Sequence, residues 1–171
     1  MVKFFRKLVD GFLGIILILA VILILLLFGI RLFSITPYVV TSGSMDPVYP
    51  VGSIVYVKQV PSDQLKVGDD ISFYFSEDVV ATHRIGEIHE EERNVQTYGV
   101  NNIDSEGNQI NDATPVDFDH IIGKVQFSIP ILGFAYMFIR TTQGKIALIT
   151  VVLALFAISK ILQYLEKEKR Q

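Results

Sequence analysis

The chain has 171 residues, half of them hydrophobic, and a formal net charge of −3 at pH 7. This length allows one folded domain together with membrane segments. The lack of cysteine excludes disulfide bonds and thiolate sites. Between Leu32 and Gln143, fifteen Asp and Glu residues stand against six Lys and Arg residues, so this part has no basic patch for a nucleic acid.

An apolar run near the N-terminus predicts a transmembrane helix. No residue from Gly11 to Ile30 is charged, and about twenty apolar residues in a helix match the hydrocarbon thickness of a bilayer. A cleavable secretory signal is the alternative, because three basic residues precede the run. Its apolar core is longer than the roughly 7–15 residues of such a signal, however, and no small-x-small cleavage site follows it. We therefore expect an uncleaved anchor over residues 11–31, preceded by a basic tail of residues 1–10.

A second apolar run extends from Ile146 to Leu162 and is weaker. It contains Lys160, whose long side chain can reach the lipid headgroups from the end of a membrane helix. A core helix or an interfacial helix is the alternative. We expect a second transmembrane helix over residues 145–163, followed by a tail of residues 164–171.

Basic residues flank the outer ends of both runs and predict the orientation. Because cytoplasmic segments carry an excess of Lys and Arg, we expect a multi-pass cell-membrane protein with both tails in the cytoplasm and residues 32–142 outside. Phe134, Tyr136 and Phe138 precede the second run, where aromatic rings suit either the headgroup region or a protein core. The flanking basic residues are Lys3, Arg6, Lys7, Lys160, Lys167, Lys169 and Arg170.

Residues 32–142 contain several strand-length runs rich in β-branched and aromatic residues, bounded by Gly, Pro and Asp. No helical period of 10–15 residues separates them, which argues against a parallel βαβ sheet. We therefore expect a mainly β fold, with an antiparallel β domain between an N-terminal and a C-terminal transmembrane helix. The polar stretch Ile103–Asp119 should form a loop or a long hairpin. The expected strands are Pro37–Thr41, Ser53–Val60, Ile71–Phe75, Val79–Ile88, Asn94–Val100 and Ile121–Phe127.

The first candidate for chemistry is the run Thr41-Ser42-Gly43-Ser44-Met45-Asp46-Pro47, which follows the first expected strand. Glycine lets the backbone turn sharply, so that a hydroxyl and neighbouring N–H groups can point at one spot. Acyl transfer needs this combination of a nucleophile and donors for the developing oxyanion. Ser-Gly-Ser is also an ordinary turn sequence, so the run alone does not identify a nucleophile.

His83 is the candidate base and lies within an apolar strand. A serine hydroxyl needs a neighbour that accepts its proton, and histidine titrates near neutral pH. A histidine in a strand is often only a packing residue, and His89 and His120 are rivals among acidic residues. The acid that would orient the imidazole has two candidates in the polar loop, Asp104 and Asp112, either of which could simply be solvated.

Taken together, the apolar anchor, Ser42-Gly43-Ser44-Met45-Asp46-Pro47, Thr82-His83-Arg84-Ile85, and Asn101-Asn102 with a later Asp resemble the type I signal peptidases. The resemblance is to their endoplasmic-reticulum-type branch, found in eukaryotes, archaea and some Gram-positive bacteria. That branch has His where the bacterial branch has a catalytic lysine, and the bacterial Arg-Arg and Pro-Gly-Asp signatures are missing here. The resemblance extends from the first apolar run to about Ile139.

The chain departs from the family pattern near the candidate acids. The family commonly reads Lys-Gly-Asp-Asn-Asn, whereas this chain has Tyr98-Gly99-Val100-Asn101-Asn102, so an acid is missing at Val100. Asp112-Ala113-Thr114-Pro115-Val116 is similar to the Asp-x-x-Pro-Val context of the Gram-positive members. Asp104 instead follows the two asparagines closely, as in the eukaryotic pattern. We favour Asp112 and keep Asp104 as the second candidate.

The resemblance implies a serine endopeptidase, signal peptidase I, with a Ser-His-Asp mechanism. Ser44 would attack, His83 would exchange the proton, and the Ser42 hydroxyl with the Ser44 backbone N–H would hold the oxyanion. Its substrates would be the signal peptides of exported preproteins, cut at the bilayer after small residues at positions −1 and −3. No metal or organic cofactor is implied, and the chain offers no metal-ligand spacing.

A different class of function is a catalytically inactive, membrane-anchored β domain that acts as a binding or assembly subunit. An inactive relative should have lost the nucleophile or the base, and both residue types are present at Ser44 and His83.

Overall fold

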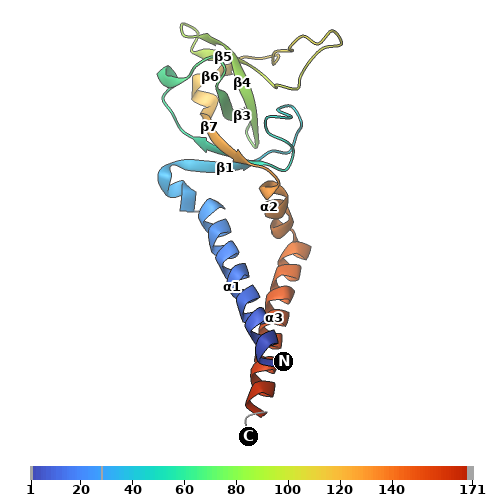
Figure 1. Cartoon of the computed structure of the whole chain (residues 1–171). Coiled ribbons are helices and arrows are strands. Elements are labelled where there is room, and N and C mark those ends of the chain that lie inside the picture. The colour runs from blue at the N-terminus through green and yellow to red at the C-terminus, as the bar shows by residue number, and fades with distance from the viewer. Residues whose placement is uncertain (1, 28, 169–171) are drawn as a thin grey trace. The chain divides into compact units, whose positions relative to one another are not determined.

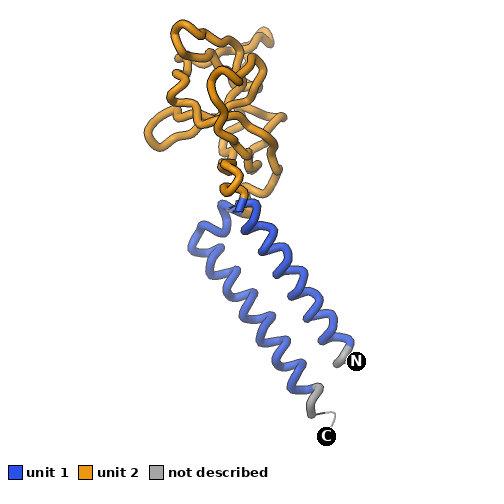
Figure 2. The backbone as a smooth tube through the Cα atoms, turned by 90° about the vertical axis from the view of Figure 1, so that its left-hand side faces the viewer, with its two compact units in different colours: residues 1–29, 136–171 blue, residues 30–135 orange. Residues whose placement is uncertain are grey.

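The computed structural model describes residues 2–27 and 29–168 and divides into two compact units. One unit is formed by Ile30–Ala135, and the other by the described residues up to Gly29 and from Tyr136 onward (Figure 2). The three α-helices and all strands except β2 are labelled in Figure 1. In chain order the elements are α1 (Val2–Leu27), η1 (Gly29–Phe33), β1 (Ile35–Val39), β2 (Ile54–Lys58), η2 (Ser62–Gln64), β3 (Asp70–Ser76), β4 (Val79–His89), β5 (Asn94–Tyr98), β6 (Val116–Asp117), η3 (Phe118–His120), β7 (Ile121–Ile129), α2 (Leu132–Arg140) and α3 (Thr142–Glu168).

The seven strands form one antiparallel sheet in the order β1-β2-β7-β3-β4-β5-β6. The predicted fold class is therefore confirmed, and each of the six expected strands has a counterpart with somewhat different ends. The polar stretch Ile103–Asp119 contains an isolated bridge between Ile103 and Gln109, as a hairpin would. It also contains β6, which we did not expect because two residues are too few to produce an alternating pattern.

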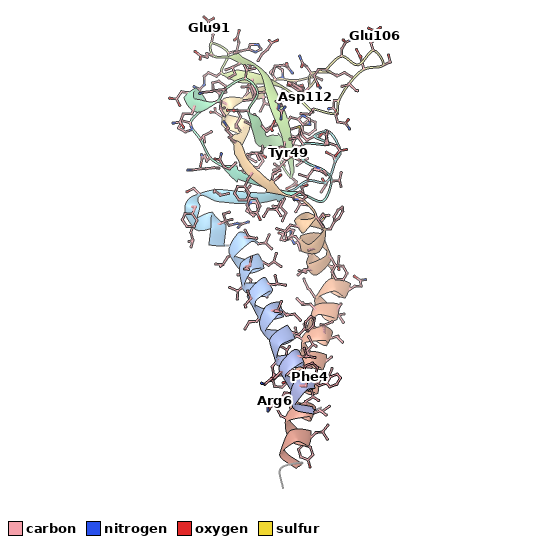
Figure 3. The ribbon with its side chains drawn as sticks, in the orientation of Figure 1. Phe4, Arg6, Tyr49, Glu91, Glu106 and Asp112 are labelled. Atoms are coloured by element: carbon pink, nitrogen blue, oxygen red, sulfur yellow. The ribbon has the colours of Figure 1, made fainter. Side chains whose placement is uncertain are left out.

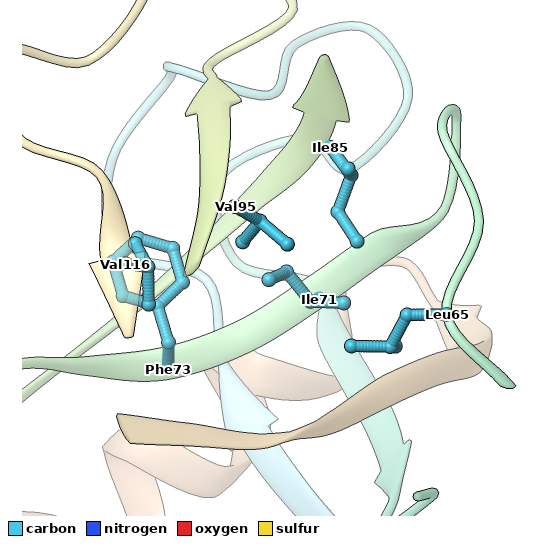
Figure 4. Packing of buried hydrophobic residues seen from close by; sticks show 6 residues of the cluster. All are labelled: Leu65, Ile71, Phe73, Ile85, Val95 and Val116. Carbon is cyan, nitrogen blue, oxygen red and sulfur yellow. The ribbon is translucent and has the colours of Figure 1, made fainter. Parts of the chain in front are cut away.

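The main core of the sheet unit comes from residues that alternate along the strands. Ile71 and Phe73 of β3 pack with Ile85 of β4 and Val95 of β5, joined by Leu65 and Val116 (Figure 4). Alternate strand residues point to the same face, so this spacing places β3, β4 and β5 over one apolar layer. Without disulfides, burial of this surface is the main source of the unit's stability.

β2 is buried on both of its faces. Four consecutive residues, Ile54 to Val57, are at most 1% exposed. Val55 and Val57 pack with Val125 of β7 in a second cluster, while the Tyr56 ring stacks on Phe127 with centroids 4.4 Å apart. Because β2 is buried in this way, it fixes the position of the edge strand β1, which pairs with it and leads into the Ser42–Pro47 segment.

The second unit contains the two apolar helices, α1 and α3. The segments Phe4–Phe33 and Thr142–Leu165 are long and apolar enough to cross a membrane, and most of their large apolar side chains are exposed. The two helices meet through a hydrogen bond of 3.1 Å from the Ser159 hydroxyl to Asp10. Exposed apolar helices of this length suggest association with a membrane.

Candidate active site

Ser44 lies in a tight turn between β1 and β2. The Asp46 N–H donates to the Gly43 carbonyl at 3.1 Å, and the Tyr49 N–H donates to the Met45 carbonyl at 2.9 Å. The Met45 side chain is only 2% exposed, so it anchors the turn in the protein interior. Burial of the residue after Ser44 leaves the serine itself at the surface of the turn.

The segment after β5 holds this turn through hydrogen bonds to its backbone carbonyls. The Asn101 N–H donates to the Ser44 carbonyl at 2.7 Å, and the Asn101 side-chain amide donates to the Gly43 carbonyl at 3.1 Å. A Cβ atom at Gly99 would lie 2.8 Å from the Ser44 carbonyl oxygen, so a side chain there would displace the serine. At Val100, where the resembling family has an acid, the backbone N–H contacts the Met45 sulfur at 3.5 Å.

His83 contacts both of the other candidate triad members. It is on β4, opposite Ile71 of β3. Its Nε2 atom lies 3.0 Å from the Ser44 hydroxyl oxygen, and its Nδ1 atom lies 2.6 Å from Oδ2 of Asp112. The His83 and Asp112 side chains are 14% and 20% exposed, respectively. Because an ionised carboxylate only accepts hydrogen bonds, Nδ1 carries the proton and Nε2 is free to accept one from Ser44.

Asp112 is held by the neighbouring strand β5. Its backbone N–H donates to the Thr97 carbonyl at 2.8 Å, and the Gln96 side-chain amide donates to its carbonyl at 2.7 Å. The Thr97 hydroxyl donates to Oδ2 at 2.6 Å. Asp112 lies beside the sheet, whereas Glu106 marks the far end of the same loop (Figure 3).

Asp104, the second candidate acid, is bound within its own turn. Its carboxylate accepts hydrogen bonds from the Glu106 N–H and from the backbone and side chain of Asn108. These bonds, those from Asn108 first, lower the pKa of the fully exposed Asp104 below its ordinary value. The structure therefore brings Asp112 to His83 and uses Asp104 to close the loop.

Of the remaining candidates, Ser42 contacts Ser44, whereas His89 and His120 have other partners. The Ser42 hydroxyl is exposed and lies 3.3 Å from the Ser44 hydroxyl oxygen. His89 bonds to Asn94 at 2.9 Å and to Glu87 at 3.3 Å, interactions that raise its pKa, chiefly through Asn94. His120 is exposed and lies 3.8 Å from Asp117. Neither rival histidine is bonded to a serine among the described contacts.

A polar network connects the turn after Ser44 to β3 and to β4, the strand that carries His83. The Tyr49 hydroxyl donates to Asp70 at 2.8 Å, and the Arg84 guanidinium binds both oxygens of the same carboxylate at 2.7 and 3.0 Å. Burial, followed by the bond to Asp70, raises the pKa of Tyr49, so its hydroxyl remains a donor. No pattern in the sequence predicts this network, because Asp70 and Tyr49 look like ordinary turn and strand-end residues.

A cleft of about 320 Å³ opens beside Ser44 and His83. Its walls come from the end of β1, from Met45 and Tyr49, and from Val79 to Thr82 on β4. A larger cavity of about 580 Å³ is lined by Phe75, Glu77 and the segment 114–117 and contains neither Ser44 nor His83. We place the candidate site in the smaller cleft because a nucleophile and a base must be in contact. Among the described residues, no group of three or more His, Asp or Glu side chains is arranged to hold a metal.

Comparison with known proteins identifies relatives of this chain. Residues 13–92, which include Ser44 and His83, match the family model described as signal peptidase, peptidase S26. The signal peptidase complex catalytic subunit sec11 of Dictyostelium discoideum is 29% identical over 126 residues, covering 71% of this chain and 70% of that protein. These similarities confirm the resemblance that the motifs predicted, to the type I signal peptidases of the endoplasmic-reticulum type.

Proposed function

We propose that this protein is a membrane-bound serine endopeptidase that removes N-terminal signal peptides from exported preproteins. The main support is the unbroken series of contacts from the Ser44 hydroxyl through both His83 nitrogens to Asp112, with distances of 3.0 and 2.6 Å. The series lies beside a cleft and occurs in a relative of the signal peptidases. A nucleophile, a base and an orienting acid in this order are the requirements for acyl transfer by serine.

In the proposed acylation step, the Ser44 oxygen attacks the scissile carbonyl carbon while its proton moves to Nε2 of His83. The negative charge that develops on the carbonyl oxygen is stabilised by donors aimed at that position; by analogy with the family, these are the Ser44 N–H and the Ser42 hydroxyl. The tetrahedral intermediate then breaks its C–N bond, and His83 gives the proton to the leaving amine. The mature protein leaves, and the signal peptide remains esterified to Ser44.

Deacylation repeats the sequence with water. His83 accepts a proton from water as the water oxygen attacks the ester carbonyl, and returns it to Ser44 when the C–O bond breaks. Asp112 keeps its charge throughout and stabilises the imidazolium that forms in each step. The signal peptide is released with a free carboxylate, and the enzyme returns to its starting state.

The proposed substrates carry small residues at positions −1 and −3, as the resemblance implies. The cleft beside Ser44 is lined largely by the β1 end and by Val80, Ala81 and Thr82 of β4. Strands on two sides suit a peptide in extended conformation, whose alternate side chains would face the same wall. Positions −1 and −3 would therefore enter the cleft together.

We further propose that α1 and α3 span the cell membrane, with both tails in the cytoplasm and the sheet unit outside. The sheet unit itself exposes large apolar side chains at both ends of its sequence, namely Leu32 and Phe33, and Ile131 and Phe134. These residues adjoin the proposed spans in sequence, and apolar and aromatic groups suit the membrane–water interface. Such a surface would keep Ser44 at the depth where the cleavage region of a signal peptide emerges from the bilayer.

Single introduced cysteines test this topology, because the natural chain contains none. A membrane-impermeant thiol reagent applied to intact cells should label Glu106→Cys but neither Lys3→Cys nor Lys169→Cys. After permeabilisation, all three variants should react, which controls for accessibility. Labelling of Lys169→Cys in intact cells would show that the second apolar helix does not cross the membrane.

Cleavage of a purified preprotein tests the function itself. The protein, purified in detergent or lipid vesicles, should release a mature product whose new N-terminus follows a small residue at −1. Ser44→Ala should eliminate this product, because it removes the hydroxyl that His83 Nε2 contacts. A parent chain that binds the preprotein without cleaving it would instead support an inactive binding or assembly subunit.

A further inference from the structure

We infer that Thr97 is a positioning residue that fixes the orientation of Asp112, the carboxylate that orients His83. This inference rests on the proposed peptidase function and extends it to a fourth side chain. The Thr97 hydroxyl donates to Oδ2 of Asp112 at 2.6 Å. His83 binds the same oxygen through Nδ1, also at 2.6 Å. Thr97, Asp112, His83 and Ser44 therefore form one continuous series of hydrogen bonds.

The Thr97 side chain has no alternative partner in water. The residue is on β5 opposite Ile85, and its relative exposure is 0%. A buried hydroxyl must be hydrogen-bonded, because its burial without a partner costs free energy. Threonine is also stiff at χ1 because it is branched at Cβ. The hydroxyl is therefore a fixed donor, held by a strand of the sheet.

Asp112, in contrast, comes from a loop. Its backbone is tied to β5 by the Thr97 carbonyl and the Gln96 side chain. These two bonds fix the position of the Asp112 backbone and leave its carboxyl group free to rotate. Among the described contacts, the donors to that carboxyl group are His83 and Thr97. His83 changes its charge during catalysis, so Thr97 is the donor that remains constant through the cycle.

The geometry matches a hydrogen bond to an ionised carboxylate. O–H···O⁻ bonds are typically about 2.5–2.7 Å long and roughly twice as strong as bonds between neutral groups. Such a bond keeps Oδ2 aimed at Nδ1 and keeps the carboxylate available as an acceptor. The imidazole is then held in the tautomer that leaves Nε2 free for the Ser44 proton.

The test compares Thr97→Val, which has nearly the same shape but no hydroxyl, with Thr97→Ser, which restores the donor. With the preprotein as substrate, Thr97→Val should lower kcat about tenfold or more, the loss expected for a hydrogen bond to a charged group. Its KM should stay within about twofold, because Thr97 does not line the substrate cleft. Thr97→Ser should recover most of the lost kcat. Ser72→Ala is a matched control, because Ser72 is an equally buried strand hydroxyl whose partner is Thr82.

A second measurement separates positioning from general stability. In an Asp112→Asn background, Thr97→Val should cause little further loss of kcat, because the carboxylate that it orients is gone. The same tenfold loss in both backgrounds, or a Thr97→Val rate equal to that of the parent, would overturn the inference while leaving the peptidase function intact. A parent chain that fails to cleave the preprotein would overturn the proposed function and this inference together.

Discussion

Replacing His83 with alanine should abolish cleavage, with kcat falling by about 10⁴-fold or more. The serine hydroxyl is a weak nucleophile unless a neighbour takes its proton, and Nε2 of His83 lies 3.0 Å from that hydroxyl. The variant should still fold, because the His83 side chain is partly exposed and meets the main core cluster at its edge, where its ring lies against Phe73. The measurement is single-turnover cleavage of a preprotein, together with the melting temperature of each variant.

The three lysines of the sheet unit should be dispensable for proton transfer from Ser44. Lys58 and Lys66 are exposed, and the Lys124 ammonium is 2.6 Å from the Asp69 carboxylate. A base must be in contact with the hydroxyl whose proton it takes, and the described contacts of the Ser44 hydroxyl are with His83 and Ser42. Lys58→Ala, Lys66→Ala and Lys124→Ala should each retain most of the parent rate.

His89→Ala is the matched control for this experiment. His89 is at the end of the same strand, β4, and its ring is bonded to Asn94 and Glu87. We expect the His89→Ala variant to cleave the preprotein at about the parent rate. Substantial cleavage by His83→Ala, together with loss of cleavage in one of the lysine variants, would contradict the assignment to the His-type branch.

The sheet was predictable because its signal is local. β3 buries Ile71 and Phe73, two residues apart, and such alternation is visible in the sequence without knowledge of the strand's neighbours. The Ser44 turn and the strand of His83 were identified for the same reason, since each stands in a short run with a recognisable composition. The composition of these runs does not predict that the two side chains meet across 39 residues of chain. We expected the contact from the family resemblance, and it depends on the pairing of β1, β2, β7, β3 and β4.

The supporting residues were not predictable from local patterns. In the sequence Thr97 looks like any other strand residue. The need for glycine at position 99 becomes clear only in the structure, where a Cβ atom would lie 2.8 Å from the Ser44 carbonyl oxygen. The choice between Asp104 and Asp112 depends on the path of a polar loop with no periodic signal. That path is determined by the Thr97 carbonyl, which accepts the Asp112 N–H, and by the turn that Asp104 closes on Asn108.

Asp112→Asn should lower kcat by about 10⁴-fold, whereas Asp104→Asn should remain within about twofold of the parent. An amide at position 112 can present its NH₂ group to the imidazole, which favours the tautomer with the proton on Nε2 and leaves that nitrogen unable to accept the Ser44 proton. Asp104 has no such role, because its carboxylate bonds to Glu106 and Asn108 in an exposed turn.

The pH dependence of stability offers a separate readout for Asp104. Its carboxyl pKa is lower in the folded chain than its ordinary value, chiefly because of the Asn108 bonds. The stability that it contributes is therefore present above the ordinary Asp pKa and is lost as the pH falls through the lowered value. Asp104→Asn should remove this pH-dependent contribution at the loop and leave cleavage at neutral pH unchanged.

If Asp104→Asn instead lost as much kcat as Asp112→Asn, the loop would have to rearrange in the enzyme–substrate complex, and Asp112 would not be the sole orienting acid. Equal cleavage by both variants and the parent would reduce the triad to a Ser44–His83 dyad.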